Sequence, residues 1–105
     1  MAAITEIFIL KMKDPQRAEV IRERAREDFT LLEGVISWKT YVTTDIHRSL
    51  LFAEVYTFPD HATAKRVTPQ FAERELTKAF LAEVDEVIVG QYFTEHLPMG
   101  ASHDE

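Results

Sequence analysis

The sequence predicts an α+β domain in which a four-stranded antiparallel sheet carries its helices on one face. Runs rich in β-branched and aromatic residues, typical of strands, occupy residues 4–12, 35–44, 50–58 and 87–94. A polar link of a few residues joins the second and third of these runs, which predicts a hairpin. With a helical segment after the first run and another after the third, the order is β-α-β-β-α-β. Right-handed crossovers then give the ferredoxin-like arrangement.

The first helix is expected to begin after Asp14 and to end near Gly34. Asp is a favoured N-cap residue, and Pro15 suits the first helical position because its missing N–H would be unpaired there in any case. Apolar residues then recur at helical spacing, at Ala18, Ile21, Ala25, Phe29 and Leu32. This pattern predicts an amphipathic helix of about five turns.

The second helical region is expected to be broken. Asp60 caps a short helix that runs through Val67, and the Thr68-Pro69 step repeats the combination of a capping residue followed by proline. We therefore expect a second helix over residues 69–85. Residues 97–105 contain Pro, Gly and Ser without any period, so the single domain is expected to occupy about residues 4–96 and to be followed by a loose tail.

Composition excludes several classes of function. The chain has 105 residues, the length of one domain, and a net charge of -6, which disfavours a nucleic-acid partner. It has no cysteine, and its four histidines lack metal-ligand spacing, so we expect no metal and no thiol chemistry. No apolar run approaches the roughly 18 residues of a membrane span, and no secretion signal is apparent at the N-terminus, so a cytoplasmic protein is expected.

Glu54 is the residue that stands out, because it lies in the apolar centre of the third predicted strand. Desolvating an ionised carboxylate costs several kcal/mol unless the group is paired or hydrated. Glu54 therefore has a partner, faces a wet cavity, or is held protonated. We weigh two interpretations equally: Glu54 is a general base in an apolar pocket, or it is a structural partner of Lys39 across the hairpin or of a hydroxyl group.

Side chains alternate between the two faces of a strand, which divides the predicted sheet into two sets. The first set is almost wholly apolar and is expected to pack beneath the helices; it contains Ile7, Ile9, Ile36, Trp38, Thr40, Val42, Leu51, Ala53 and Val55. The second set mixes aromatic, hydroxyl and charged side chains; it contains Glu6, Phe8, Leu10, Ser37, Lys39, Tyr41, Phe52, Glu54 and Tyr56. We expect a second copy of the chain to cover this mixed face and to enclose a half-polar cavity.

The run Glu-Val-Tyr-Thr-Phe-Pro-Asp-His at residues 54–61 resembles a segment of the antibiotic biosynthesis monooxygenase family of the dimeric α/β barrel superfamily. Residues 67–71 and the Glu33-Gly34 step are also similar to segments of that family. The resemblance covers about residues 4–96 and implies a ferredoxin-like homodimer that oxidises small substrates. Haem-degrading members use an Asn on the first strand, and this chain has no Asn, so haem degradation is disfavoured.

The leading functional hypothesis is a cofactor-independent monooxygenase-like homodimer that oxidises a small aromatic or quinol-type substrate. Glu54 is the expected base, and His61 is a second catalytic candidate, although a surface role for His61 is favoured. The expected substrate-binding residues are Glu6, Phe8, Ser37, Lys39, Tyr41, Phe52, Tyr56 and Phe71. The alternatives are a non-catalytic dimer that binds a small apolar ligand or serves in a stress response, and, with less weight, an isomerase or lyase.

Overall fold

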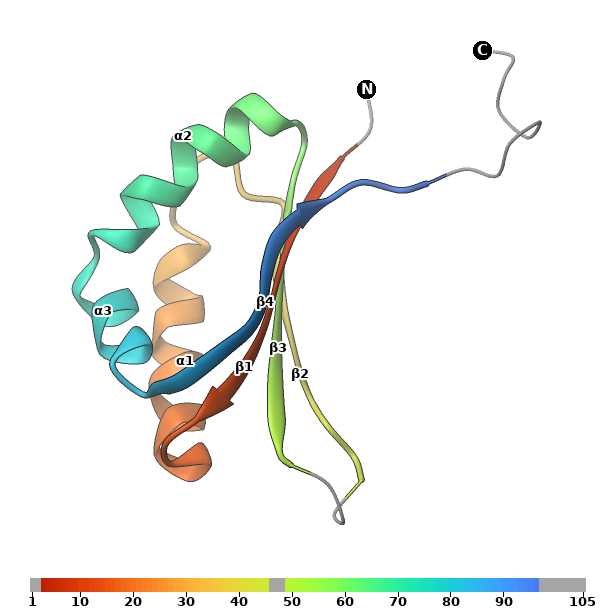
Figure 1. Ribbon diagram of the computed structural model, residues 1–105. Helices are drawn as coiled ribbons and strands as arrows, with labels where there is room; N and C mark the ends of the chain where they lie inside the picture. The colour runs from red at the N-terminus through yellow and green to blue at the C-terminus, as the bar shows by residue number, and fades with distance from the viewer. Residues whose placement is uncertain (1–2, 46–48, 97–105) are drawn as a thin grey trace.

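The computed structural model describes residues 3–45 and 49–96, and they form the predicted four-stranded sheet with helices on one face (Figure 1). The expected tail at residues 97–105 lies outside this part of the chain. The strands are β1 (Ile4–Met12), β2 (Ser37–Val42), β3 (Leu51–Phe58) and β4 (Val84–Phe93). Their order in the sheet is β2-β3-β1-β4, and every neighbouring pair is antiparallel. The ferredoxin-like prediction is therefore confirmed.

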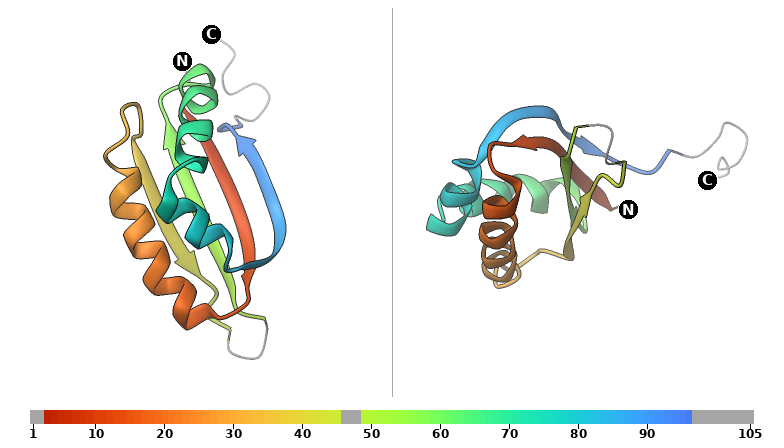
Figure 2. Two further views of the ribbon diagram at one scale, coloured as in Figure 1. Left: turned by 90° about the vertical axis from the view of Figure 1, so that its left-hand side faces the viewer. Right: turned by 90° about the horizontal axis from the view of Figure 1, so that it is seen from below.

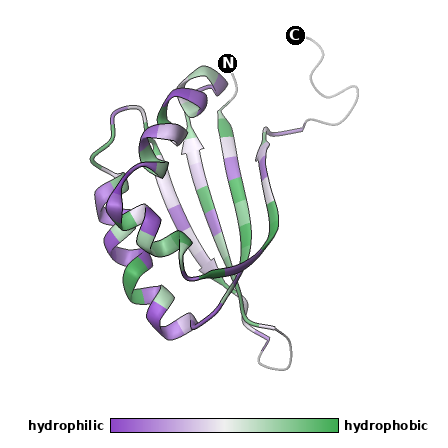
Figure 3. Ribbon diagram, turned by 60° about the vertical axis from the view of Figure 1, so that its left-hand side comes forward, coloured by the Kyte–Doolittle hydropathy of each residue, from purple (hydrophilic) through white to green (hydrophobic). Residues whose placement is uncertain are grey.

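The helices are α1 (Pro15–Phe29), α2 (His61–Ala72) and α3 (Glu75–Leu81). All three lie on the same side of the sheet, and no described element covers the other side (Figure 2). Hydrophilic and hydrophobic stretches alternate along the helices, and hydrophobic stretches recur along β1 (Figure 3). None of the helices in the described residues is long and apolar enough to cross a membrane.

The start of each longer helix follows the sequence signals. The Asp14 carboxylate accepts a hydrogen bond from the Arg17 backbone N–H, and the Asp60 carboxylate accepts one from that of Thr63, at 3.3 and 2.8 Å. These are N-cap interactions of the kind predicted. The Asp60 bonds lower the pKa of that carboxyl group.

The expected helix break at Thr68-Pro69 is wrong, because α2 continues through Pro69 to Ala72. A proline inside a helix removes one backbone hydrogen bond and costs about 3 kcal/mol. Pro69 itself is exposed, while the buried Ala64 and Val67 fix the helix against the core on its other side. Tertiary packing thus moves the break to Glu73 and Arg74, where the Arg74 guanidinium pairs with Asp28 of α1.

The assignment of faces is also wrong for β1 and β3. In the observed register Trp38 lies opposite Tyr56, and Phe8 lies opposite Glu54. Partners in a ladder share a face, so these residues point to the helices together, as the buried Trp38 shows. The residues turned away from the helices include Ile7, Ile9, Ala53 and Val55, together with Ser37, Lys39 and Tyr41 of β2. Shifting the pairing of two strands by one residue moves every side chain of a strand to the other face of the sheet. The sequence pattern grouped Trp38 with Ile7, Ile9, Ala53 and Val55, whereas the observed register places Trp38 on the same face as Tyr56 and Glu54.

The core is an aromatic cluster centred on Phe29 of α1. Its ring contacts those of Trp38, Tyr56, Phe58 and Phe71, with centroids 4.4 to 6.4 Å apart. Large rings fill the gap between sheet and helices better than the Ile, Ala and Val side chains of the opposite face. This explains why the mixed set, rather than the purely aliphatic one, lies beneath the helices.

Candidate functional site

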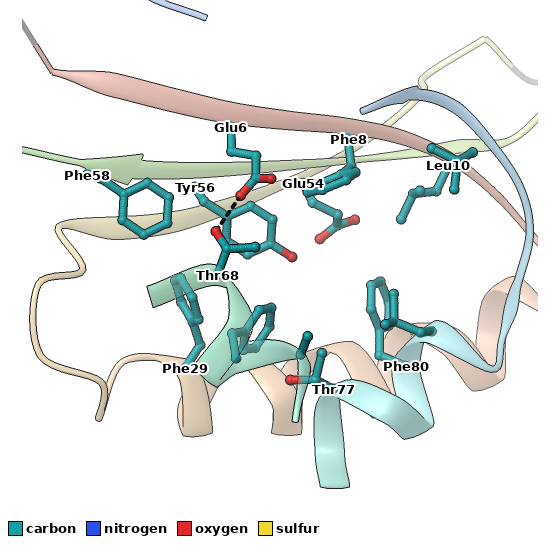
Figure 4. Close-up of a pocket in the computed structure, with 14 residues that line it drawn as sticks. Glu6, Phe8, Leu10, Phe29, Glu54, Tyr56, Phe58, Thr68, Thr77 and Phe80 are labelled. Atoms are coloured by element: carbon teal, nitrogen blue, oxygen red, sulfur yellow. Dashed lines mark hydrogen bonds between the residues drawn. The ribbon is translucent and has the colours of Figure 1, made fainter. Parts of the chain in front are cut away.

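A cavity of about 140 Å³ lies between the sheet and the helices of a single chain (Figure 4). Strands β1, β3 and β4 supply one wall, and helices α1, α2 and α3 supply the other. The lining residues are Glu6, Phe8, Leu10, Glu54, Tyr56, Phe58 and Val87 from the strands, and Phe29, Thr68, Phe71, Ala72, Thr77, Phe80 and Leu81 from the helices. This cavity lies within a single chain, whereas the cavity expected from the sequence lies between two copies of the chain.

Glu54 reaches the cavity wall, but its carboxylate is already engaged. Arg22 of α1 donates three hydrogen bonds to it, of 2.6 to 3.0 Å, and the Trp38 indole N–H donates a fourth, of 2.9 Å. Glu54 has no exposed surface. Burial raises the pKa of Glu54, and the hydrogen bonds and charge of Arg22 with the bond from Trp38 oppose that rise. A carboxylate has about four acceptor positions, so Glu54 has little capacity left to accept a substrate proton.

The predicted partnership of Glu54 with Lys39 is wrong. Lys39 lies opposite Val55 on the face away from the helices and is exposed. Arg22 takes its place from α1, where Ala18, Arg22, Ala25 and Phe29 form the buried stripe. The spacing of 18, 22, 25 and 29 is itself helical, so the sequence did contain a signal that Arg22 points inward.

Glu6 is the carboxylate that remains available to a ligand. It is 8% exposed, lines the cavity and lies opposite Tyr56 in the sheet. Among the described residues its hydrogen-bond partner is the Thr68 hydroxyl, which donates to Glu6 Oε1 at 3.2 Å. Burial raises the pKa of Glu6, and the bond from Thr68 partly offsets this rise. A carboxylate with one weak partner in an apolar cavity is suited to accept a proton.

Tyr56 supplies a phenol group beside the two carboxylates. Burial raises the pKa of Tyr56 well above its usual value, and the charges of Glu54 and Glu6 add to the rise. The hydroxyl therefore stays protonated at neutral pH and is able to donate a hydrogen bond. Tyr56 is thus a candidate for orienting an oxygen atom of a ligand.

Some of the other predicted site residues lie at the cavity, and the rest lie away from it. Phe8 and Phe71 line the cavity, whereas Phe52 is buried beside it, with the Arg22 guanidinium 4.1 Å from its ring centroid. His61 is exposed, contacts the Tyr92 ring and is absent from the cavity wall. Ser37, Lys39 and Tyr41 lie on the opposite face of the sheet and do not meet Glu54.

Thr68 and Thr77 are the polar lining residues that the sequence prediction missed. Thr68 belongs to the Thr-Pro step that was interpreted as a helix break, and a single Thr such as Thr77 carries no sequence signal for a pocket. Among the residues that the structure describes, neither Lys nor Arg lines the cavity, which disfavours a phosphorylated ligand. Within residues 3–45 and 49–96, no group of three or more His, Cys, Asp or Glu side chains is arranged to hold a metal ion.

No protein-family model matches the chain, and no curated protein matches its sequence. Solved structures do match it. SnoaB, a cofactor-independent oxygenase from Streptomyces nogalater, aligns with a TM-score of 0.64 at 13% identity, over 94% of this chain and 96% of that one. The chain shares its fold. A dabb family protein with a ferredoxin-like fold from Mesorhizobium loti aligns with a TM-score of 0.64 at 15% identity, over 95% of this chain and 100% of that one.

A third structure, At3g17210 from Arabidopsis thaliana, aligns with a TM-score of 0.68 at 14% identity, over 94% of this chain and 98% of that one. These matches cover nearly the whole of each chain. They confirm the fold that the sequence resemblance implies, and at such identities they show the fold alone.

Proposed function

We propose that this protein is a cofactor-independent monooxygenase-like enzyme that oxidises a small aromatic or quinol-type substrate in the cavity beneath its helices. The observation that carries the proposal is the buried Glu6 carboxylate, which lines an apolar cavity beside the Tyr56 phenol and has a raised pKa. The shared fold with a cofactor-independent oxygenase adds support.

In this mechanism Glu6 takes a proton from a phenolic O–H or an acidic C–H of the substrate, and the Tyr56 hydroxyl donates a hydrogen bond to the oxygen of the resulting anion. The electron-rich anion then reduces O₂. If the substrate has a reactive CH₂ group, one atom of O₂ becomes the oxygen of a new carbonyl group at that carbon. The other atom of O₂ leaves as water, together with the two hydrogens of the CH₂ group. If the substrate is a hydroquinone, it gives the quinone and hydrogen peroxide.

The aromatic walls suit such a substrate. Phe8, Phe29, Phe71 and Phe80 line the cavity, and a flat aromatic ring packs well against such side chains. The largely apolar wall of the cavity also strengthens the interactions that Glu6 and Tyr56 make with a charged intermediate.

Oxygen uptake with a panel of quinols tests the proposal. We expect Glu6→Gln to reduce the rate at least 100-fold, since general base catalysis typically contributes that much. The exposed Glu19→Gln on α1 serves as the matched control and should leave the rate unchanged. Equal rates in wild type and Glu6→Gln would remove Glu6 from the mechanism.

The second candidate is a non-catalytic dimer that binds a small apolar ligand. The mainly apolar wall of the cavity favours such a binding role. Native mass spectrometry that finds a co-purified ligand, together with no oxygen uptake on the quinol panel, would favour binding over catalysis.

We also propose that a second copy of the chain covers the face of the sheet opposite the helices. Ile7, Ile9, Ala53 and Val55 form the centre of that face, and none of them is fully buried in the monomer. A contiguous apolar area of this kind is typical of an association site. Such a dimer would leave the cavity within each chain, on the other side of the sheet.

A further inference from the structure

Thr68 of α2 joins the helical layer to the carboxylate of Glu6. Its hydroxyl donates to Glu6 Oε1 at 3.2 Å from 62 positions away in the sequence, and both residues line the cavity. A threonine inside a helix often donates its hydroxyl to the carbonyl four residues earlier in the same helix. Thr68 donates to β1 instead, so this bond depends on how α2 packs against the sheet.

Helical spacing turns Thr68 toward the sheet. Ala64 and Val67 of the same helix are buried, and Phe71 lines the cavity, so Thr68 lies on the inward side of α2 among them. Pro69, the next residue, is exposed. The hydroxyl is therefore placed by the buried stripe of a helix, which holds its direction.

The two carboxylate oxygens of Glu6 have different surroundings. Oε1 accepts the bond from Thr68, whereas Oε2 has no hydrogen-bond partner in the described part of the chain. Among the described residues Thr77 Oγ1 alone is both unpaired and fully enclosed, so the unpaired Oε2 of Glu6 retains accessible surface. Figure 4 shows it turned away from Thr68, toward the side where Phe8 lies. Oε2 is therefore the oxygen that a ligand in the cavity reaches.

The other groups around Glu6 do little to keep it ionised. Tyr56 of β3 and Tyr92 of β4 lie opposite it in the sheet, and both are neutral phenols. Glu54 of β3 is a second buried carboxylate, and Arg22 of α1 is committed to it. Helices α2 and α3 place no charged residue on the described cavity wall, and no described cation forms an ion pair with Glu6.

We propose that Thr68 is a positioning residue for Glu6: its hydroxyl holds Oε1 and favours the ionised carboxylate, which leaves Oε2 facing the ligand and free to take its proton. The inference rests on the proposed function in taking Glu6 as the base, and it adds the residue that prepares this base. Burial raises the pKa of Glu6, and the bond from Thr68 lowers it. Such a bond is stronger to an ionised acceptor than to a neutral one, so it weakens when Glu6 is protonated.

NMR of the side-chain carboxyl carbons measures the titration of Glu6 separately from that of Glu54, and the resonance that Glu6→Gln removes is the one to follow. We expect Thr68→Val, which keeps the side-chain shape and removes the hydroxyl, to titrate Glu6 at a higher pH than wild type. Thr68→Ser keeps the donor and should restore the wild-type titration. Thr57→Val is the matched control, because Thr57 lies on the opposite face of the sheet, paired with Thr5. It should leave the titration unchanged.

Oxygen uptake on the quinol panel, recorded as a function of pH, gives the catalytic measurement. On the acid side of the profile Thr68→Val should be about tenfold slower than wild type, the effect of losing one hydrogen bond to a charged group. The loss should appear in kcat, since the base acts in the chemical step, and the profile should move to higher pH together with the titration of Glu6. Thr68→Ser should follow wild type.

Thermal unfolding separates this role from a purely structural one. A Thr68→Val protein with a lower Tm but the wild-type titration of Glu6 would show that the bond only ties α2 to β1, and would overturn the inference. Failure of Thr68→Ser to restore the titration would also overturn it.

Failure of the proposed function is separately visible. A titration of Glu6 that depends on Thr68, in a protein that takes up no oxygen with quinols, would support the role of Thr68 toward Glu6 and reject the oxidation. Oxygen uptake that depends on Glu6 but has the same pH profile in Thr68→Val would support the oxidation and reject the role of Thr68.

Discussion

The Arg22 guanidinium of α1 and the Glu54 carboxylate of β3 form a buried ion pair, with Nη2 and Oε2 2.6 Å apart. The same guanidinium donates to the Tyr41 backbone carbonyl at 2.9 Å, and the Trp38 indole donates to the carboxylate. One helix and two strands are thereby joined at a single charged cluster. The pair accounts for a carboxylate in the centre of an apolar strand without giving it a catalytic role.

Replacing Arg22 should therefore destabilise the fold strongly. Arg22→Met keeps much of the side-chain volume but leaves Glu54 buried and unpaired, and breaking a buried pair in this way costs about 3–5 kcal/mol. Urea unfolding measures the loss. Arg24→Met, an exposed position on the same helix, is the control and should change the free energy of unfolding by less than about 0.5 kcal/mol. A similar small loss for Arg22→Met would mean that the ion pair does not stabilise the fold.

Glu6 should make stability fall as pH rises. Its pKa is raised in the folded protein above the ordinary value of 4.5, so the native state holds the proton more tightly than the unfolded chain. This contribution to stability is complete below pH 4.5 and is lost as pH rises through the folded pKa. Glu6→Gln cannot titrate, so its free energy of unfolding should decline less across that interval. Urea unfolding at a series of pH values measures the difference, and parallel curves for the two proteins would contradict the prediction.

Gly90 of β4 should control the space available in the cavity. A Cβ at this position would lie 3.0 Å from two atoms of the Phe8 ring, so Gly90→Ala pushes that ring toward the cavity that it lines. We expect hydroquinone affinity to fall several-fold in anaerobic titration. The double variant Phe8→Leu/Gly90→Ala, which has a smaller side chain at position 8, should recover part of the loss. Unchanged affinity in Gly90→Ala would show that Phe8 moves away from the ligand.

A charge at the centre of the open sheet face should prevent association. Val55 lies opposite Ile7 in the middle of that face, and Val55→Lys would place an ammonium group in the proposed interface. We expect light scattering to show a dimer for wild type at micromolar concentration and a monomer for Val55→Lys. Val20→Lys, on the exposed surface of α1, should remain dimeric. A wild-type monomer would contradict the proposed dimer while leaving the cavity argument intact.

The order of strands and helices was predictable because it depends on local patterns. The strand runs, the Asp14 and Asp60 caps and the helical spacing after Pro15 act over a few residues, and each is present in the structure. The break at Thr68-Pro69 was mispredicted because a local signal competed there with packing. Burial of Val67 and Ala64 outweighed the helix-breaking tendency of proline.

The functional face of the sheet was decided by tertiary structure. Both faces of the strands are apolar enough to be buried, so alternation by itself does not say which one the helices cover. The register that sets Trp38 opposite Tyr56, and the inward turn of Arg22 toward Glu54, select the face with Glu6 and its cavity. Residue spacing along the chain therefore determined the fold and marked Glu54 as unusual. Only long-range pairing between strands and helix could show that Arg22 and Trp38 occupy the Glu54 carboxylate. The same pairing leaves Glu6 as the carboxylate that faces the cavity.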